Sequence, residues 1–119
     1  KKGFYYAPTL LTDVKPGMPA FDEEVFGPVI SLIAANDEAQ AIDLANQSNF
    51  GLGCGVFSQN TEKATKIITN ELDAGFGQVN GTVRSSPELP FGGVKGSGFG
   101  RECGIHGLQE FANIKTIIV

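Results

Sequence analysis

The sequence predicts an α/β fold in which the strands of a parallel sheet alternate with covering helices. Residues 29–35 (VISLIAA) form a continuous apolar run, which is typical of a strand covered on both faces. From there to Asn80, helix-like and strand-like stretches alternate with short links, and this order favours parallel pairing. A chain of 119 residues is long enough for one modest core.

The chain before this strand is predicted to be extended and then looped. Residues 4–14 (FYYAPTLLTDV) are rich in aromatic and β-branched side chains, but Pro8 interrupts them. Pro16, Gly17 and Pro19 then favour a loop, because prolines and glycine interrupt regular structure. The predicted order is therefore an extended segment, a loop and the first covered strand.

A first helix is predicted to follow that strand. Asn36 or Asp37 can cap its N-terminus, and Gln40 stands where the far half of a capping box from Asp37 belongs. Residues 49–51 (NFG) end the helix. By helical spacing, its buried stripe is predicted to consist of Ala41, Ile42, Leu44 and Ala45.

A second strand, a second helix and a third strand are predicted next. The strands are residues 53–57 (GCGVF) and 75–80 (GFGQVN). Asn60 or Thr61 caps the helix between them. Its apolar side chains recur at helical spacing, at Ala64, Ile67, Ile68 and Leu72.

The pattern changes after Asn80, where residues 81–102 are predicted to form a long loop. Its last part, residues 90–102, holds five glycines, two cations and two phenylalanines. Glycine loses the most backbone entropy on ordering, and apolar runs flank this segment on both sides. We therefore expect a shaped loop at the edge of a site or an interface.

The C-terminus is predicted to carry a short helix and a final strand. The helix covers residues 103–112 and places Ile105, Leu108 and Phe111 on one face. Residues 113–119 (NIKTIIV) form the strand, which has no obvious partner within the unit. Because an unpaired apolar edge promotes aggregation, we interpret this strand as a subunit contact. An ordinary edge strand of its own sheet is the alternative.

Charge and composition exclude several classes of partner. The net charge is −4 without a block of like charges, so a basic footprint for nucleic acid and a polybasic membrane patch are absent. No apolar run approaches membrane-spanning length, we expect no signal peptide, and two cysteines fit a reducing cytosol, so a cytoplasmic protein is expected. The chain opens at Lys1 without an initiator Met, and we expect a piece of a longer polypeptide.

The glycines do not form a nucleotide-phosphate motif. The fingerprint GxGxxG fails in the registers that begin at Gly51, Gly96 and Gly98, because Val56, Arg101 and Cys103 stand at the last glycine position, and GxxxxGK[ST] is absent. Cys54 and Cys103 are predicted to be structural thiols, and His106 a surface or packing residue. No metal site is expected, because one histidine and two distant cysteines lack ligand spacing.

Residues 23–28 (EEVFGP) carry the strongest polar signal. They place Glu23, Glu24 and Phe26 beside a rigid Gly-Pro corner that precedes a buried strand. A carboxylate at such a place can accept hydrogen bonds from sugar hydroxyls, and a ring can pack on a flat heterocycle. A turn with solvated acids is the alternative.

Together these segments resemble the C-terminal part of the NAD(P)-dependent aldehyde dehydrogenase family. The matching stretches run in order over nearly the whole chain, at residues 4–14, 23–28, 41–52 (AIDLANQSNFGL), 55–59 (GVFSQ), 79–80, 90–102 and 107–108. The resemblance implies a three-layer parallel-sheet unit over residues 1–112, the C-terminal portion of the catalytic domain. It further implies an oligomerisation strand over residues 113–119, a homo-oligomer, and NAD or NADP as cofactor.

The resemblance also implies roles for single residues. Glu24 would bond the hydroxyls of the nicotinamide ribose, and Phe26 would support the nicotinamide ring. Phe91 resembles a ring that lines the substrate tunnel. Glu102 resembles a member of a proton-relay network, and Arg101 resembles a residue that braces the subunit interface.

In this family the loop before residue 90 reaches toward the substrate tunnel and sets specificity. Arg84, Ser85 and Ser86 occupy it here, and this polar loop resembles the succinate-semialdehyde type. Ser85 would donate to the distal carboxylate of the substrate, and Arg84 would add positive charge. Another polar aldehyde, or a CoA-acylating relative, is the open alternative.

The family's nucleophilic cysteine, general-base glutamate, oxyanion-hole asparagine and adenosine-binding domain precede the matching segment, and none is in this chain. Aldehyde oxidation through a thiohemiacetal needs that nucleophile, so the chain alone is expected to be inactive. Its expected partners are the missing N-terminal portion of the same enzyme and an aldehyde substrate. The competing hypothesis is a non-catalytic folding or interaction module that pairs through residues 113–119.

Overall fold

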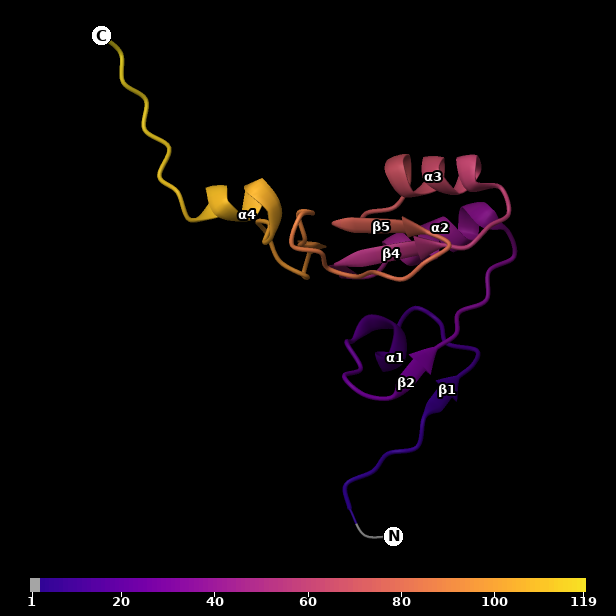
Figure 1. Cartoon of the computed structure of the whole chain (residues 1–119). Coiled ribbons are helices and arrows are strands. Elements are labelled where there is room, and N and C mark those ends of the chain that lie inside the picture. The colour runs from indigo at the N-terminus through magenta and orange to yellow at the C-terminus, as the bar shows by residue number, and fades with distance from the viewer. Residues whose placement is uncertain (1–2) are drawn as a thin grey trace. The chain divides into compact units, whose positions relative to one another are not determined.

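The computed structural model describes residues 3–119, which form two compact units (Figure 1). The first unit is Lys1–Ser48 and the second is Asn49–Val119. Both contain parallel strand pairs connected through helices, so the predicted α/β class with parallel pairing is confirmed. None of the helices in the described residues is both long enough and apolar enough to cross a membrane.

The first unit is built on the parallel pair of β1 (Thr9–Leu11) and β2 (Val29–Ser31). The connection between them contains a short helix, α1 (Pro19–Asp22), where the sequence predicted only a loop. Proline is suited to the first turn of a helix, because its fixed φ is helical and its missing N–H would have no intrahelical partner. Pro19 therefore starts a helix here and does not exclude one.

The predicted strand at residues 29–35 is shorter and less covered than expected. It ends at Ser31, and Ile30 is 68% exposed. Leu10 pairs with Ile30 across the two strands and is also exposed. The prediction of a strand covered on both faces is therefore wrong for the described residues, because nothing in this unit lies against the face that carries these two side chains.

The next helix, α2 (Glu38–Asn46), confirms the predicted N-terminus but not the predicted burial. Asp37 caps it by accepting a 2.8 Å hydrogen bond from the Gln40 N–H, and Gln40 Oε1 accepts one of 2.6 Å from the Asn36 N–H. The predicted stripe is not buried, since Ala41 and Ala45 are exposed. The helix instead borders an open apolar hollow of about 200 Å³, which is lined by Phe21, Ile33, Ala35, Ala41, Leu44 and Ala45.

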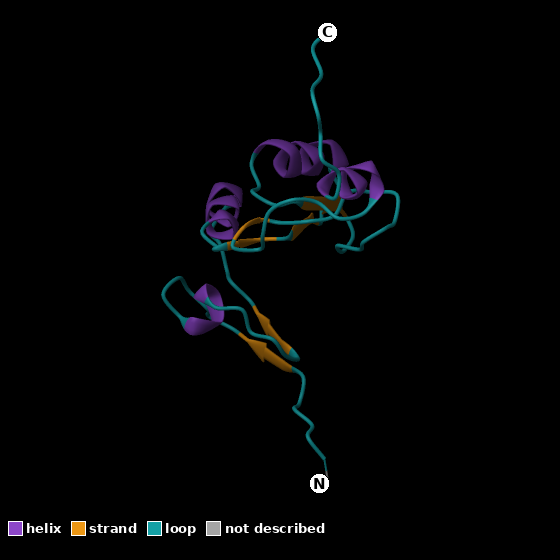
Figure 2. Cartoon of the chain, turned by 90° about the vertical axis from the view of Figure 1, so that its left-hand side faces the viewer, coloured by secondary structure: helices purple, strands orange, loops and turns teal. Residues whose placement is uncertain are grey.

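The second unit is centred on a strand–helix–strand motif, as predicted. β4 (Gly53–Val56) and β5 (Phe76–Val79) pair in parallel, and α3 (Thr61–Asn70) lies along them (Figure 2). Asn60 caps α3 by accepting a 2.9 Å hydrogen bond from the backbone N–H three residues later. The buried side chains of the helix are Ala64 and Ile67, which are 1% and 7% exposed.

The strands of residues 3–119 form three separate pairs and not the single sheet that the sequence predicted. The third pair is antiparallel and joins β3 (Phe50–Gly51) to β6 (Val94–Lys95). Both strands are two residues long. The sequence predicted a loop without strands over residues 81–102, so it missed β6. The three-layer arrangement stays a prediction, because the described pairs are not joined into one sheet.

The chain ends with α4 (Gly104–Glu110) and an extended tail (Figure 1). The helix is shorter than the predicted range of 103–112, and Ile105, Leu108 and Phe111 are all exposed. Residues 113–119 pair with no other strand in the described part of the chain. Their role as an oligomerisation strand therefore stays a prediction.

Candidate functional site

The glycine-rich segment 90–102 is closed at its ends into a loop. Phe91 and Glu102 form an antiparallel bridge, in which each backbone N–H donates to the carbonyl oxygen of the other at 2.8 Å. The predicted tunnel residue and the predicted relay residue are thus brought side by side. The sequence alone indicated a shaped loop, and this bridge gives the loop its ends.

The middle of the segment is fastened to the start of the second unit. β6 pairs with β3, and the Gly96 N–H donates to Asn49 O at 2.8 Å. The Gly51 N–H donates to Ser97 Oγ at 2.9 Å. The bridge between Phe91 and Glu102 therefore holds the base of the loop, and residues 49–51, which are distant in sequence, hold its middle.

One close backbone contact fixes how the loop lies on β5. A Cβ atom at Gly75 would lie 1.9 Å from the carbonyl oxygen of Gly92, well inside any allowed contact. Two glycine backbones therefore pass each other at a distance that no other residue permits at position 75. The ring centroids of Phe76 and Phe91 lie 6.4 Å apart, and they continue this contact through side chains.

These contacts leave a hollow of about 390 Å³ in the second unit. Phe91 is half-buried at its wall, and Glu102 lines it with an exposed side chain. The remaining wall consists of Leu52, Gly92, Gly93, Ser97, Phe99, Gly100, Arg101, Glu110 and Phe111. The arrangement combines apolar rings with two carboxylates and one guanidinium, a mixture that suits a small polar organic ligand.

Arg84 and Ser85 lie on the connection that leads from β5 to the glycine-rich segment. Both side chains are exposed, and neither has a hydrogen-bond or ion-pair partner within residues 3–119. The neighbouring Ser86 hydroxyl instead donates to Glu88 Oε2, which lowers the pKa of the Glu88 carboxyl. Of the two adjacent serines, Ser85 thus has the hydroxyl that is available to a ligand.

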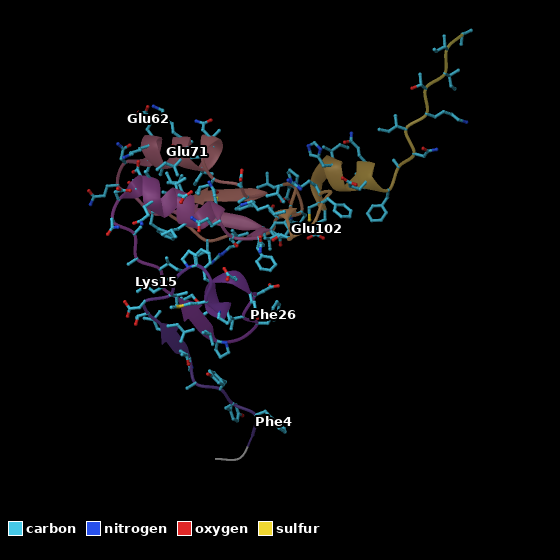
Figure 3. The ribbon with its side chains drawn as sticks, turned by 180° about the vertical axis from the view of Figure 1, so that it is seen from behind. Phe4, Lys15, Phe26, Glu62, Glu71 and Glu102 are labelled. Carbon is cyan, nitrogen blue, oxygen red and sulfur yellow. The ribbon has the colours of Figure 1, made fainter. Side chains whose placement is uncertain are left out.

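Glu24 and Phe26 lie in the first unit, on the corner between α1 and β2. Backbone hydrogen bonds fasten both ends of this corner, from the Glu23 N–H to Pro19 O at 2.9 Å and from the Thr9 N–H to Pro28 O at 2.9 Å. Their side chains are nevertheless exposed, and Phe26 is 95% exposed (Figure 3). A fixed backbone thus presents an uncovered carboxylate and an uncovered ring.

The remaining candidate side chains show no catalytic arrangement. Cys54 is half-buried on β4, and this burial raises the pKa of its thiol. The thiol therefore stays protonated at neutral pH, which makes it a poor nucleophile. Cys103 is half-buried before α4, and His106 is exposed on that helix. No group of three metal-ligating side chains occurs within the described residues.

Sequence reasoning did not find the internal role of Arg101. Its Nη1 donates to Gly93 O at 3.0 Å and to Gly100 O at 2.6 Å, so the guanidinium joins two carbonyls of the same loop. The signal available in the sequence was an arginine inside a glycine-rich segment. That signal did not indicate which carbonyls the guanidinium would bond.

The sequence profile of the aldehyde dehydrogenase family matches residues 1–117. The chain belongs to this family. It is 48% identical over 117 residues to succinate-semialdehyde dehydrogenase [NADP(+)] 1 of Mycobacterium ulcerans, covering 98% of this chain and 25% of that protein. It is 47% identical over 115 residues to a probable succinate-semialdehyde dehydrogenase [NADP(+)] of Synechocystis, covering 97% and 25%. The chain thus spans about a quarter of the length of these curated relatives.

Solved structures of the family have the same fold as this chain. The structure of Gox0499 is 44% identical, has a TM-score of 0.92, and is matched over 100% of this chain and 26% of its own. Betaine aldehyde dehydrogenase of Staphylococcus aureus in complex with NAD+ is 39% identical and has a TM-score of 0.86. The match covers 92% of this chain and 21% of that chain. Mycobacterium tuberculosis aldehyde dehydrogenase complexed with NAD+ is 38% identical and has a TM-score of 0.85. The match covers 92% of this chain and 22% of that chain.

Proposed function

We propose that this chain forms the nicotinamide-facing and substrate-facing part of an NAD(P)-dependent enzyme that oxidises succinate semialdehyde to its carboxylic acid. The observation that carries the proposal is 48% identity along 98% of the chain to a succinate-semialdehyde dehydrogenase. Residues 1–112 would be the C-terminal portion of its catalytic domain, and residues 113–119 would pair with another copy in a homo-oligomer. The nucleophile and the adenosine-binding domain would lie elsewhere in the enzyme.

The corner at residues 23–28 suits the nicotinamide half of the cofactor. The Glu24 carboxylate accepts hydrogen bonds only, so it complements the two hydroxyl donors of a ribose. Phe26 is almost fully exposed, and its bare ring offers a flat face to a heterocycle. The bound cofactor would supply the hydride acceptor, and these two residues would orient it. NAD and NADP share this half, so the corner suits either one.

The loop and hollow of the second unit suit a small aldehyde with a distal carboxylate. Ser85 would donate a hydrogen bond to that carboxylate, and Arg84 would add a charge-assisted donor. Phe91 would pack along the apolar part of the substrate from its place on the wall of the hollow. Glu102 would accept and pass on a proton in the relay. Another polar aldehyde, or a CoA-acylating reaction, would use the same donors.

The proposal predicts that the chain is inactive alone and active in a complete enzyme. Purified residues 1–119 should reduce neither NAD+ nor NADP+ with succinate semialdehyde. A graft in which residues 1–117 replace the matching quarter of the Mycobacterium ulcerans relative should reduce NADP+. The measurement is cofactor absorbance under both conditions. A folded graft that binds cofactor but oxidises no aldehyde would support the non-catalytic module instead.

Ser85→Ala in this graft should raise KM for succinate semialdehyde about tenfold, because a hydrogen bond to a charged group is lost. KM for propionaldehyde, which has no carboxylate, should hardly change. Thr65→Ala removes another exposed hydroxyl, on the outer side of α3, and serves as the matched variant. An equal change in KM for both aldehydes would remove the carboxylate-binding role of Ser85.

A further inference from the structure

We infer that Arg101 is a positioning residue, which sets the place of the Phe91 ring by fastening the glycine-rich segment to itself. The fastening consists of contacts within this chain and does not depend on any substrate. Its consequence for the substrate rests on the proposed function, because it requires Phe91 to line the substrate side of the hollow.

The geometry of the guanidinium carries the first step. Arg101 Nη1 donates to Gly93 O at 3.0 Å and to Gly100 O at 2.6 Å. The first carbonyl lies on the arm of the loop that leaves Phe91, and the second lies on the arm that returns to Glu102. The side chain is half-buried and forms no ion pair within residues 3–119. A charged donor on a carbonyl forms a stronger hydrogen bond than a neutral one. The Nη1 amino group of the guanidinium therefore joins these two arms.

The backbone of the segment shows why the two hydrogen bonds from Arg101 Nη1, which we call the clasp, are needed. Gly98 has a φ of +115° and Gly100 a φ of +78°, so this arm adopts conformations that glycine allows but that its backbone alone does not select. A Cβ at Gly92 would lie 2.7 Å from Gly100 O and 3.0 Å from Arg101 Cδ. The glycine at position 92 thus makes room for the arginine stem to cross the loop. Without the guanidinium, this glycine-rich backbone gains alternative conformations.

The clasp lies next to the residue that it positions. Phe91 is bonded through its backbone to Glu102, the residue after Arg101, and Gly93 follows two positions later. Its ring contacts Phe76 on β5 at a centroid distance of 6.4 Å. Movement of the two arms would shift the bridge and thereby the ring. Arg101 would act on a substrate through this shift, since its Nη1 amino group is bonded to two backbone carbonyls and not to a ligand group.

Amide hydrogen exchange in the complete 119-residue chain tests the clasp without any catalysis. Arg101→Met should accelerate exchange of the Phe91 and Glu102 amides about tenfold or more, whereas amides of the β4–β5 pair should not change. Arg101→Lys keeps the charge without the guanidinium fork and should give a smaller acceleration. Lys66→Met, at an exposed cation on α3, is the control that should change neither amide.

Unchanged exchange at Phe91 and Glu102 would overturn the inference, as would an equal acceleration of every amide. If Arg101→Met does not fold, Arg101→Lys decides by the same comparison. Partial retention of slow exchange in the lysine variant would support the clasp. Exchange in that variant identical to the unsubstituted chain would overturn it, because the shorter, differently placed ammonium group would then show that the position of Nη1 does not matter.

A double-mutant cycle in the graft tests the step from the clasp to the substrate. Arg101→Met should raise the aldehyde KM about fivefold to tenfold and leave the cofactor KM unchanged. In a Phe91→Ala background it should add nothing, because Arg101 acts through that ring. Additive effects would overturn the positioning role. If Phe91→Ala alone leaves the aldehyde KM unchanged while the exchange result holds, the clasp stands and the proposed role of Phe91 is wrong.

Discussion

Gly75→Ala is expected to lower the free energy of unfolding of the chain by about 3 kcal/mol or more, as overpacking against a fixed backbone does. The new methyl carbon would lie 1.9 Å from Gly92 O. This oxygen cannot move aside easily, because the loop that contains it is bonded to Asn49, Gly51 and Glu102. The strain would therefore separate the glycine-rich segment from β5.

Thermal unfolding followed by circular dichroism measures this effect, with an expected fall in Tm of more than about 10 °C. Gly27→Ala is the matched control, since a Cβ there meets nothing within 4 Å. Reduced chain entropy in the unfolded state should make that variant neutral or slightly more stable. A similar Tm for both variants would mean that the close approach of Gly75 and Gly92 contributes little to stability.

Glu24→Gln in the graft should slow hydride transfer about tenfold to a hundredfold, the range for losing charge-assisted hydrogen bonds. The amide keeps the size of the carboxylate but replaces one acceptor with a donor, so a ribose diol is held less well. Misplacement of the nicotinamide then lowers the rate of the chemical step, because reacting atoms need close alignment. Single-turnover kinetics with succinate semialdehyde, together with the cofactor Kd, measure both consequences.

Glu23→Gln is the control for this experiment, because it changes the neighbouring exposed carboxylate on the same corner. The backbone N–H of Glu23 caps α1, and its side chain has no assigned role. A variant at Glu24 with the same transfer rate and the same cofactor Kd as the unsubstituted graft would show that this carboxylate does not contact the ribose. Loss of rate in both variants would indicate a general distortion of the corner.

The predictable parts of the fold depended on interactions within a few residues. Asp37 and Asn60 each cap a helix by accepting a hydrogen bond from the N–H three residues later. Ala64 and Ile67 follow helical spacing and are buried against the parallel pair. Spacing and side-chain chemistry over such short distances are written directly in the sequence.

The sequence failed where burial depended on surroundings that it did not specify. The stripe of α2 has the apolar spacing of a buried face, yet Ala41 and Ala45 are exposed in this chain. Ile30 has the character of a covered strand and is 68% exposed. Apolar patterning indicates which face tends to be covered, but the covering element itself comes from elsewhere in space. For both elements, none of the described residues supplies it.

By itself, the sequence determined the α/β class, the starts of α2 and α3 and the family resemblance that the profile match confirms. It also singled out Phe91 and Glu102 without placing them together. Only the tertiary structure decided that these residues form a bridge, that Gly75 passes Gly92 without room for a side chain, and that Arg101 bonds two carbonyls of its own loop. Capping is local and follows from side-chain type, whereas closing a glycine-rich loop depends on backbone groups that every residue carries alike.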